Sequence, residues 1–346
     1  MEILSYCFLD ENNNILLSNN ENININPASN LKIITGYSIY KLLGKNHEFK
    51  TNFDIENDSI YISGDPTPLL QFYDLYNISK SLHGNSIIKN VFFDNIYDNK
   101  YYGKGWAIED TKFCYAAKIE PYTVNEVCIP DNFDYTSSKF IKPHDNGMHP
   151  YYNNKKLFSE FLLYNINNKN NGNKKNYIYK NNIKDIINHI ENVSCNFSIE
   201  VILKYLSYNK YGKGTWDKSI EIVNSFIKSF YGNMDNIRIA DGSGLSRLNI
   251  TNTFFISSFI NKIYKNDKEF LLLLPGPGKG TLKNRLNKSS YIIYAKTGTL
   301  NGCSLLSGFI DNNKISFSIA INNSLNETGV NELKIDNLLL NKLKNL

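Results

Sequence analysis

The sequence predicts a mixed α/β (α+β) fold in which helices flank an antiparallel sheet, with a smaller β-rich domain inserted into it. Apolar residues recur at helical spacing over residues 181–230, whereas residues 291–321 form three short apolar runs separated by turn residues. Over residues 51–150 the helical period gives way to short β-type runs. We therefore expect a discontinuous main domain of residues 1–50 and 151–346 around an inserted second domain of residues 51–150.

The composition is that of a globular protein. The chain has 346 residues, of which 42% are hydrophobic and 21% charged, so it can bury one large core or two smaller ones. The formal net charge of +5 is spread over interspersed lysines and acidic residues. This distribution argues against a nucleic-acid partner. The sequence contains no apolar stretch of the roughly 18 residues that a bilayer-spanning helix needs, and residues 1–5 do not resemble a secretory signal.

The five cysteines show no spacing typical of a metal site, so we expect no structural metal. Most of them are expected to be buried apolar residues. Cys114 and Cys128 could form a disulfide in an oxidising compartment, but the sequence alone leaves this open.

Residues 31–43 are predicted to form a buried helix, because the run is apolar on almost every face. Pro27 precedes the run and Gly44 follows it, as is usual for helix ends. Ser29 and Lys32 are three positions apart, so their side chains can meet on one face of the helix. Burial lowers the pKa of a lysine, so Lys32 could take the proton of the Ser29 hydroxyl and activate it as a nucleophile.

A second candidate group is Ser194 with Asn196, which follows a helical pattern over residues 183–190. The Ser194 hydroxyl could relay a proton toward a leaving amine, and the Asn196 amide could hold a substrate backbone. The same short pattern also occurs at Ser18, Ser207 and Ser324. Taken alone, the pattern indicates an ordinary turn rather than a catalytic group.

The C-terminal part predicts three antiparallel strands over residues 291–299, 304–310 and 315–321, followed by a helix that covers the sheet. Lys296 near the end of the first strand adds a fixed positive charge.

The residues that follow Lys296 are candidates for binding substrate. Thr297 and Thr299 offer hydroxyls to a substrate carboxylate, and Gly298 leaves room for a close substrate backbone. The backbone N–H groups of Thr299 and Ser29 could form an oxyanion hole.

In chain order, these groups form the SxxK, SxN and KTG set of the penicillin-recognising serine acyl-enzymes. Two longer segments, ADGSGLSRLN at residues 240–249 and LPGPGKGTLKNR at residues 274–285, extend the pattern. With them, the sequence resembles the penicillin-binding protein 4 type (DacB-type) D-alanyl-D-alanine carboxypeptidases and endopeptidases, the class C low-molecular-mass penicillin-binding proteins.

The resemblance implies a serine β-lactamase/DD-peptidase-like transpeptidase domain and hydrolysis of D-Ala-D-Ala bonds, D-Ala cross-links of peptidoglycan, or both. Stem peptides and β-lactams would be the ligands, with no cofactor and no metal, in the periplasm or cell envelope. The catalytic residues would be Ser29, Lys32, Ser194, Asn196 and Lys296, with Thr297, Gly298 and Thr299 binding substrate.

The sequence departs from the family at Cys195, where the family often has Asp, and at Lys279, where an acidic residue is common. The alternatives are a catalytically silent cell-wall scaffold and, less favoured, a β-lactamase. The sequence leaves open the preference between carboxypeptidase and endopeptidase, the oligomeric state, the route of export and the role of the insert.

Overall fold

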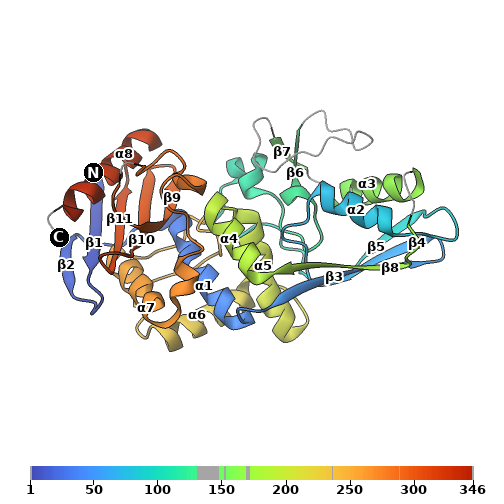
Figure 1. Cartoon of the computed structure of the whole chain (residues 1–346), viewed down its shortest axis with the longest axis horizontal. Coiled ribbons are helices and arrows are strands. Elements are labelled where there is room, and N and C mark those ends of the chain that lie inside the picture. The colour runs from blue at the N-terminus through green and yellow to red at the C-terminus, as the bar shows by residue number, and fades with distance from the viewer. Residues whose placement is uncertain are drawn as a thin grey trace.

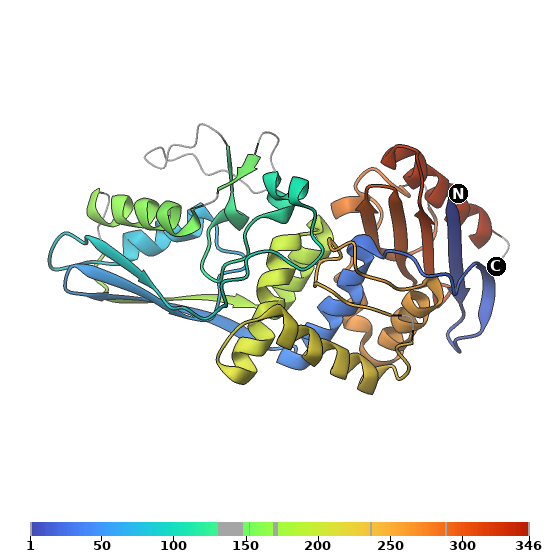
Figure 2. The ribbon, with the colours of Figure 1, turned by 180° about the vertical axis from the view of Figure 1, so that it is seen from behind.

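The computed structural model of the chain is elongated, with one β-sheet toward each end and a group of helices between them (Figure 1). Figure 2 shows the same arrangement from behind. The structure describes residues 2–130, 148–151, 153–168, 172–235, 237–287 and 289–344. Within these ranges, none of the helices combines the length and apolar character that a bilayer crossing requires.

The larger sheet is antiparallel and contains the three predicted C-terminal strands. Its strand order is β2, β1, β11, β10, β9, with the bounds β1 Ile3–Leu9, β2 Ile15–Asn19, β9 Ile293–Leu300, β10 Cys303–Ile310 and β11 Ile315–Asn322. The predicted fold class, a mixed α/β fold with an antiparallel sheet flanked by helices, is confirmed. The strands β1 and β2 were not predicted from the sequence. β1 pairs with β11, with Ile3 opposite Asn322 at one end and Leu9 opposite Ser316 at the other.

Two helices cover the two faces of this sheet. On β1, Ser5 shares a 2.7 Å hydrogen bond with Thr253 of α7, whereas Phe8 lies in one apolar cluster with Ile335 and Leu339 of α8. Odd and even positions of a strand point to opposite faces, so α7 and α8 lie on opposite sides of the sheet. Their bounds are Thr253–Leu271 for α7 and Thr328–Leu343 for α8.

The helix predicted after Ser29 is the centre of the molecule. α1 runs from Leu31 to Leu43 and is buried at every position from Leu31 to Tyr40. It contacts α7 and three helices with the bounds α4 Ile183–Val193, α5 Asn196–Tyr211 and α6 Trp216–Phe230. These neighbours on several sides explain why the helix is apolar on almost every face.

The second sheet has the strand order β5, β4, β3, β8, with the bounds β3 Glu48–Glu56, β4 Ser59–Gly64, β5 Asn90–Phe93 and β8 Asn176–Asn182. Two helices that contact each other, α2 Phe72–Ser81 and α3 Asn154–Asn168, lie beside it. β8 pairs with β3 although it lies outside the predicted insert of residues 51–150. We therefore propose residues 48–182 as the second region, because strand pairing joins its two ends.

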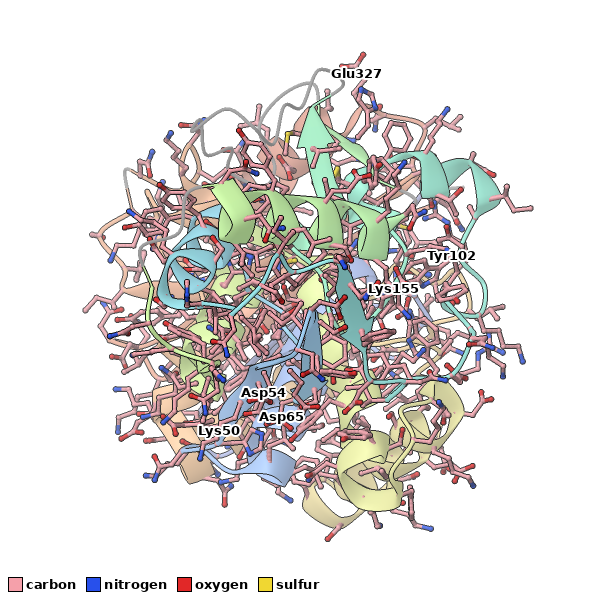
Figure 3. The ribbon with its side chains drawn as sticks, turned by 90° about the vertical axis from the view of Figure 1, so that its right-hand side faces the viewer. Lys50, Asp54, Asp65, Tyr102, Lys155 and Glu327 are labelled. Atoms are coloured by element: carbon pink, nitrogen blue, oxygen red, sulfur yellow. A yellow bond between two sulfur atoms is a disulfide. The ribbon has the colours of Figure 1, made fainter. Side chains whose placement is uncertain are left out.

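The two regions share one core. A single cluster of buried apolar side chains includes residues of α1 and of the second sheet. Hydrogen bonds also cross between the regions, from Tyr205 Oη of α5 to Asp65 at 2.8 Å and from Tyr97 Oη to Val201 O at 2.6 Å. Figure 3 views the molecule from the end formed by the second region, where Asp65 also accepts a 2.8 Å hydrogen bond from the Lys50 backbone.

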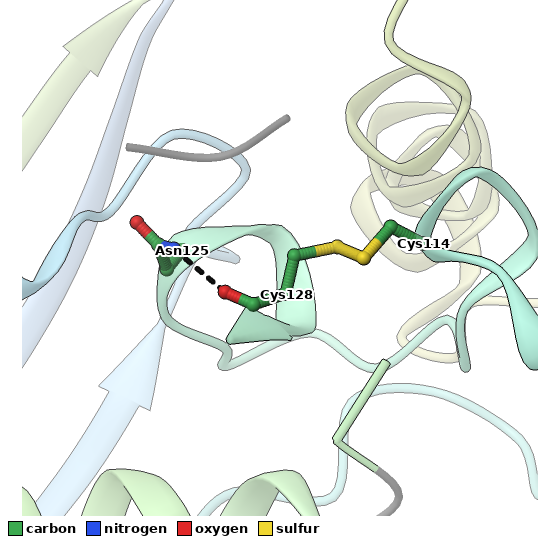
Figure 4. Close-up of a disulfide and its surroundings, with 3 residues drawn as sticks. All are labelled: Cys114, Asn125 and Cys128. Carbon is green, nitrogen blue, oxygen red and sulfur yellow. Dashed lines mark hydrogen bonds between the residues drawn. A yellow bond between two sulfur atoms is a disulfide. The ribbon is translucent and has the colours of Figure 1, made fainter. Parts of the chain in front are cut away.

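A disulfide joins Cys114 to Cys128, the pair that the sequence left open (Figure 4). It links the short 3₁₀ helix η3 Cys114–Ala116 to the strand β6 Cys128–Pro130, which pairs with β7 Met148–Pro150. Two further 3₁₀ segments of this region are η2 Ile108–Lys112 and η4 Asn125–Val127.

Candidate active site

Ser29 lies in a tight 3₁₀ turn directly before α1. The turn, η1 Ala28–Asn30, begins at Ala28, whose φ of 45° is unusual for a residue with a side chain. Gly244 packs directly against it, because a Cβ at this glycine would lie 1.8 Å from the carbonyl oxygen of Ala28. The turn that presents Ser29 is therefore held by a neighbouring loop as well as by the helix that follows.

Lys32 joins three parts of the chain. Its Nζ donates hydrogen bonds to Ser29 Oγ at 2.9 Å, to Asn196 Oδ1 at 2.6 Å and to the carbonyl oxygen of Ser243 at 2.8 Å. The side chain is fully buried. The fold thus brings together Ser29, Lys32 and Asn196, which the sequence predicted as catalytic residues from two distant motifs.

Burial lowers the pKa of both active-site lysines from their ordinary range. For Lys32 the loss of hydration dominates and is partly opposed by attraction to Glu191 and other buried acidic groups. For Lys296, also fully buried, the positive charge of Lys32 adds to the effect of burial on the pKa. Both shifts favour the neutral amine, the form that can accept a proton from serine.

Ser194 ends α4 in the left-handed conformation, with φ 59° and ψ 37°. This turn directs the chain into α5, which begins at Asn196. The Asn196 amide nitrogen donates to the carbonyl oxygen of Tyr115 at 2.9 Å, while its oxygen accepts from Lys32. Asn196 is therefore held between the nucleophile helix and η3 of the second region.

β9 is an edge strand of the main sheet and contacts the turn that carries Ser29. Gly298 is needed at this contact, because a Cβ there would lie 2.9 Å from Asn30 Oδ1 and 3.0 Å from Pro27 O. The space beside Gly298 is thus filled by the protein itself. Its predicted role in binding substrate stays a prediction.

A pocket of about 520 Å³ opens beside these groups. Five predicted residues line it, namely Ser29, Ser194, Asn196, Thr297 and Thr299. Lys32, Lys296 and Gly298 are buried and do not line it. The other lining residues are Asp110, Tyr115, Gly244, Leu245, Arg247, Thr281, Leu300, Asn301, Thr328 and Glu332.

The segment at residues 240–249 supports the nucleophile turn. The Asp241 carboxylate accepts hydrogen bonds from the backbone N–H groups of Gly244 at 2.9 Å and Ser246 at 2.6 Å. It also accepts from Trp106 Nε1 at 2.9 Å. This network fixes the loop that presents Ser243 O to Lys32, so Ser246 of this segment has a structural role.

Seven polar residues that line the pocket were not predicted as site residues, and three of them, Asp110, Tyr115 and Arg247, lie close to one another. Tyr115 Oη donates to Asp110 Oδ1 at 2.9 Å, and Arg247 Nη2 lies 3.8 Å from Asp110 Oδ2. Arg247 belongs to the recognisable segment at residues 240–249, which could have suggested it. Asp110 and Tyr115 lie in the insert outside any motif, so only the fold reveals that they face the pocket.

Solved structures show the same fold. Penicillin-binding protein 4 (dacB) from Haemophilus influenzae matches with a TM-score of 0.80 at 18% identity, covering 99% of this chain and 96% of that one. Its complex with a β-lactam matches with a TM-score of 0.73 at 18% identity and the same coverage. A predatory peptidoglycan endopeptidase from Bdellovibrio bacteriovorus gives a TM-score of 0.61 at 16% identity, covering 98% of this chain and 92% of that one.

Among curated proteins, a D-alanyl-D-alanine carboxypeptidase of Actinomadura sp. (strain R39) is 28% identical over 141 residues. The match covers 37% of this chain and spans only 26% of that relative's length. The sequence pattern of the D-Ala-D-Ala carboxypeptidase 3 (S13) family matches residues 9–147 and 179–341, which include every predicted site residue. This chain therefore belongs to the D-Ala-D-Ala carboxypeptidase 3 (S13) family.

Proposed function

We propose that this protein is a serine DD-peptidase that hydrolyses D-alanyl-D-alanine bonds of peptidoglycan stem peptides, as a carboxypeptidase, an endopeptidase or both. The observation that carries the proposal is the 2.9 Å contact between Lys32 Nζ and Ser29 Oγ at a pocket wall. Membership of the S13 family supports the substrate class. A peptidoglycan substrate implies that the protein works in the cell envelope.

In the proposed acylation step, neutral Lys32 takes the proton of Ser29 Oγ as this oxygen attacks the carbonyl carbon between the two D-alanines. Backbone N–H groups of Ser29 and Thr299 would stabilise the oxyanion. The proton then passes through the Ser194 hydroxyl to the leaving amine, and the C–N bond breaks. An ester on Ser29 remains.

Deacylation reverses these proton movements. A water molecule gives a proton to Lys32 as its oxygen attacks the ester carbonyl. The Ser29 oxygen leaves with the proton from Lys32, and the stem peptide is released as a carboxylic acid. Ser29 and neutral Lys32 are thereby restored for the next cycle.

The edge strand β9 offers a way to orient the substrate. An edge strand has backbone groups free to pair with an extended peptide, and Thr297 and Thr299 on β9 line the pocket. We infer that their hydroxyls bind the terminal carboxylate. A β-lactam would bind in the same way, since its strained amide resembles the scissile bond.

The test is intact-mass spectrometry after incubation with a labelled penicillin, comparing wild type with Ser29→Ala. Ser225→Ala is a matched control, because Ser225 also begins an SxxK pattern but lies exposed on α6. We expect one adduct in wild type and Ser225→Ala and none in Ser29→Ala. Dipeptide-ended and cross-linked stem peptides, assayed separately, then distinguish carboxypeptidase from endopeptidase activity.

Two results would reassign the protein. Absence of an adduct and of peptide hydrolysis in folded wild type would favour a catalytically silent cell-wall scaffold. Rapid turnover of the penicillin without hydrolysis of either peptide would favour a β-lactamase.

A further inference from the structure

Behind the Ser194–Asn196 turn lies a second group of reactive side chains, Glu126, His189 and Cys195. One oxygen, nitrogen or sulfur atom of each lies within 4.8 Å of the corresponding atoms of the other two. His189 Nε2 and Glu126 Oε1 are 2.5 Å apart although the residues are 63 positions apart in sequence. The fold alone therefore assembles this group, which explains why the cysteine spacing predicted no metal site.

The three side chains offer a typical ligand set for zinc. Thiolate, imidazole and carboxylate all bind Zn²⁺, and three protein ligands with one water complete a tetrahedral site. A thiolate among the ligands disfavours the hard ions Mg²⁺ and Ca²⁺, which prefer oxygen. The chemistry thus points to a borderline-soft divalent cation.

The ligand positions are held by the surrounding structure. Glu126 lies in η4 with a φ of 52°, between Asn125 and Val127, whose φ values are 56° and 65°. Three successive residues with side chains in the left-handed backbone conformation cost free energy. Such a conformation persists only where the neighbouring structure imposes it. Asn125 Nδ2 donates to Cys128 O at 2.7 Å (Figure 4), next to the disulfide.

Cys195 has a hydrogen bond that would hold it as a metal ligand, and His189 is partly exposed to solvent. Cys195 is 1% exposed, and its sulfur accepts a 3.3 Å hydrogen bond from the Ser198 backbone N–H. Such an outer hydrogen bond is usual for a metal-bound ligand. The His189 side chain is 24% exposed, so the group is not sealed from solvent.

We propose that Glu126, His189 and Cys195 bind one Zn²⁺ ion, with water as the fourth ligand. On binding, the Cys195 thiol loses its proton to solvent and the imidazole carries its proton on Nδ1. The His189–Glu126 hydrogen bond opens, since ligand atoms about 2.0–2.1 Å from a tetrahedral ion lie about 3.3 Å apart. The charges of the thiolate and carboxylate offset that of the cation.

The ion would position the second catalytic motif. Cys195 lies between Ser194 and Asn196, so a metal on its sulfur would tie this turn to α4 through His189 and to the second region through Glu126. These three ligands are positioning residues, because none of them lines the pocket. Zinc would raise the rate of acylation by ordering Ser194 and Asn196.

The test uses the full-length protein after chelator treatment, without reductant so that the Cys114–Cys128 disulfide stays intact. Calorimetric titration with Zn²⁺ measures binding, and Co²⁺ reports a metal–sulfur bond through its thiolate charge-transfer absorption. Cys195→Ser, His189→Gln and Glu126→Gln are compared with Cys303→Ser, which alters another free cysteine. His83→Gln serves as the histidine control.

We expect one Zn²⁺ per wild-type chain and the cobalt–thiolate absorption. Each ligand variant should bind at least about tenfold more weakly, and Cys195→Ser should lose the absorption, while both controls behave like wild type. The thermal midpoint of wild type should rise with Zn²⁺, a readout that needs no variant. Absence of stoichiometric binding to wild type, or equal binding by Cys195→Ser, would overturn the site whether or not Ser29 is acylated.

Discussion

Glu191 lies close to the two active-site lysines and is fully buried. Neither carboxylate oxygen has a hydrogen-bond partner among the described residues. Burial raises the pKa of Glu191, and the charges of Lys296 and Lys32 oppose that shift. The ionised carboxylate in turn holds the pKa of Lys32 higher than burial alone would leave it. Glu191 is therefore placed to tune the pKa of Lys32, the base in the proposed mechanism.

Replacing Glu191 by Gln is expected to change how the rate of penicillin acylation depends on pH. The acidic limb of this pH profile should move to lower pH by about 1 unit. Without the negative charge, the pKa of Lys32 falls further and its neutral form persists at lower pH. The measurement is the rate of penicillin acylation as a function of pH. Glu221→Gln, a change on the exposed face of α6, should leave the limb in place, and a shift to higher pH in Glu191→Gln would contradict the expectation.

The sequence predicts contacts between residues that are close along the chain better than contacts between distant ones. Ser29 and Lys32 are only three positions apart, where the turn η1 leads into α1, so their contact follows from their spacing in the sequence. The contact from Lys32 to Ser243 O depends on a loop more than 200 residues away, and no sequence pattern specifies that distance. The pocket positions of Asp110 and Tyr115 likewise follow from how the insert folds back toward α5.

The loop around Gly244 illustrates how one element supports another. Its φ of 84° favours glycine, and a Cβ there would overlap the backbone of Ala28 in the nucleophile turn. Any side chain at this position must therefore displace η1, the turn that presents Ser29.

Gly244→Ala is expected to lower the free energy of unfolding by about 2–4 kcal/mol, from backbone strain and overpacking together. The displaced turn should also slow acylation by at least about 100-fold, since small misplacements of reacting groups cost that much. Chemical denaturation and the penicillin adduct rate measure the two effects. Gly212→Ala is the control, because Gly212 also has a positive φ, 76°, but a Cβ there would meet no atom within 4 Å. This substitution should lower the free energy of unfolding by about 1 kcal/mol and leave the acylation rate unchanged. Equal effects of the two substitutions would contradict the packing argument.

Helices and strands with a strong period of apolar residues were predicted from the sequence. Strands whose place in a sheet depends on a distant pairing partner were not. The buried helix α1, the helices α4 to α6 and the C-terminal strands all follow from apolar spacing. β8 has a weak pattern of exposed and half-buried residues, so its sequence does not show that it joins the second sheet. The pairing of β8 with β3 is the reason for our proposal that the second region spans residues 48–182.

The disulfide lies one residue from a contact between the insert and the candidate site. Cys114 is followed by Tyr115, whose carbonyl oxygen accepts the hydrogen bond from Asn196. Releasing η3 from β6 would therefore loosen the hydrogen bond of Asn196 as well as the insert.

The double variant Cys114→Ser/Cys128→Ser is expected to lose about 3 kcal/mol of unfolding free energy, as for a closed loop of about 15 residues. Acylation should slow as well, because Asn196 loses a fixed acceptor. Thermal unfolding and the adduct rate measure these effects, with Cys303→Ser as the control that alters a free cysteine. An unchanged thermal midpoint in the double variant would show that the bond does not restrain the fold.

The pairing of β1 with β11 has a consequence for how the protein is made. β1 leaves the ribosome well before β11, the strand that it hydrogen-bonds to, which is synthesised more than 300 residues later. The main sheet therefore cannot close until β11 has been synthesised, and contacts between such distant segments slow folding. During synthesis, β1 must remain unpaired with its final partner, so the nascent chain carries an exposed strand edge that chaperones would need to shield.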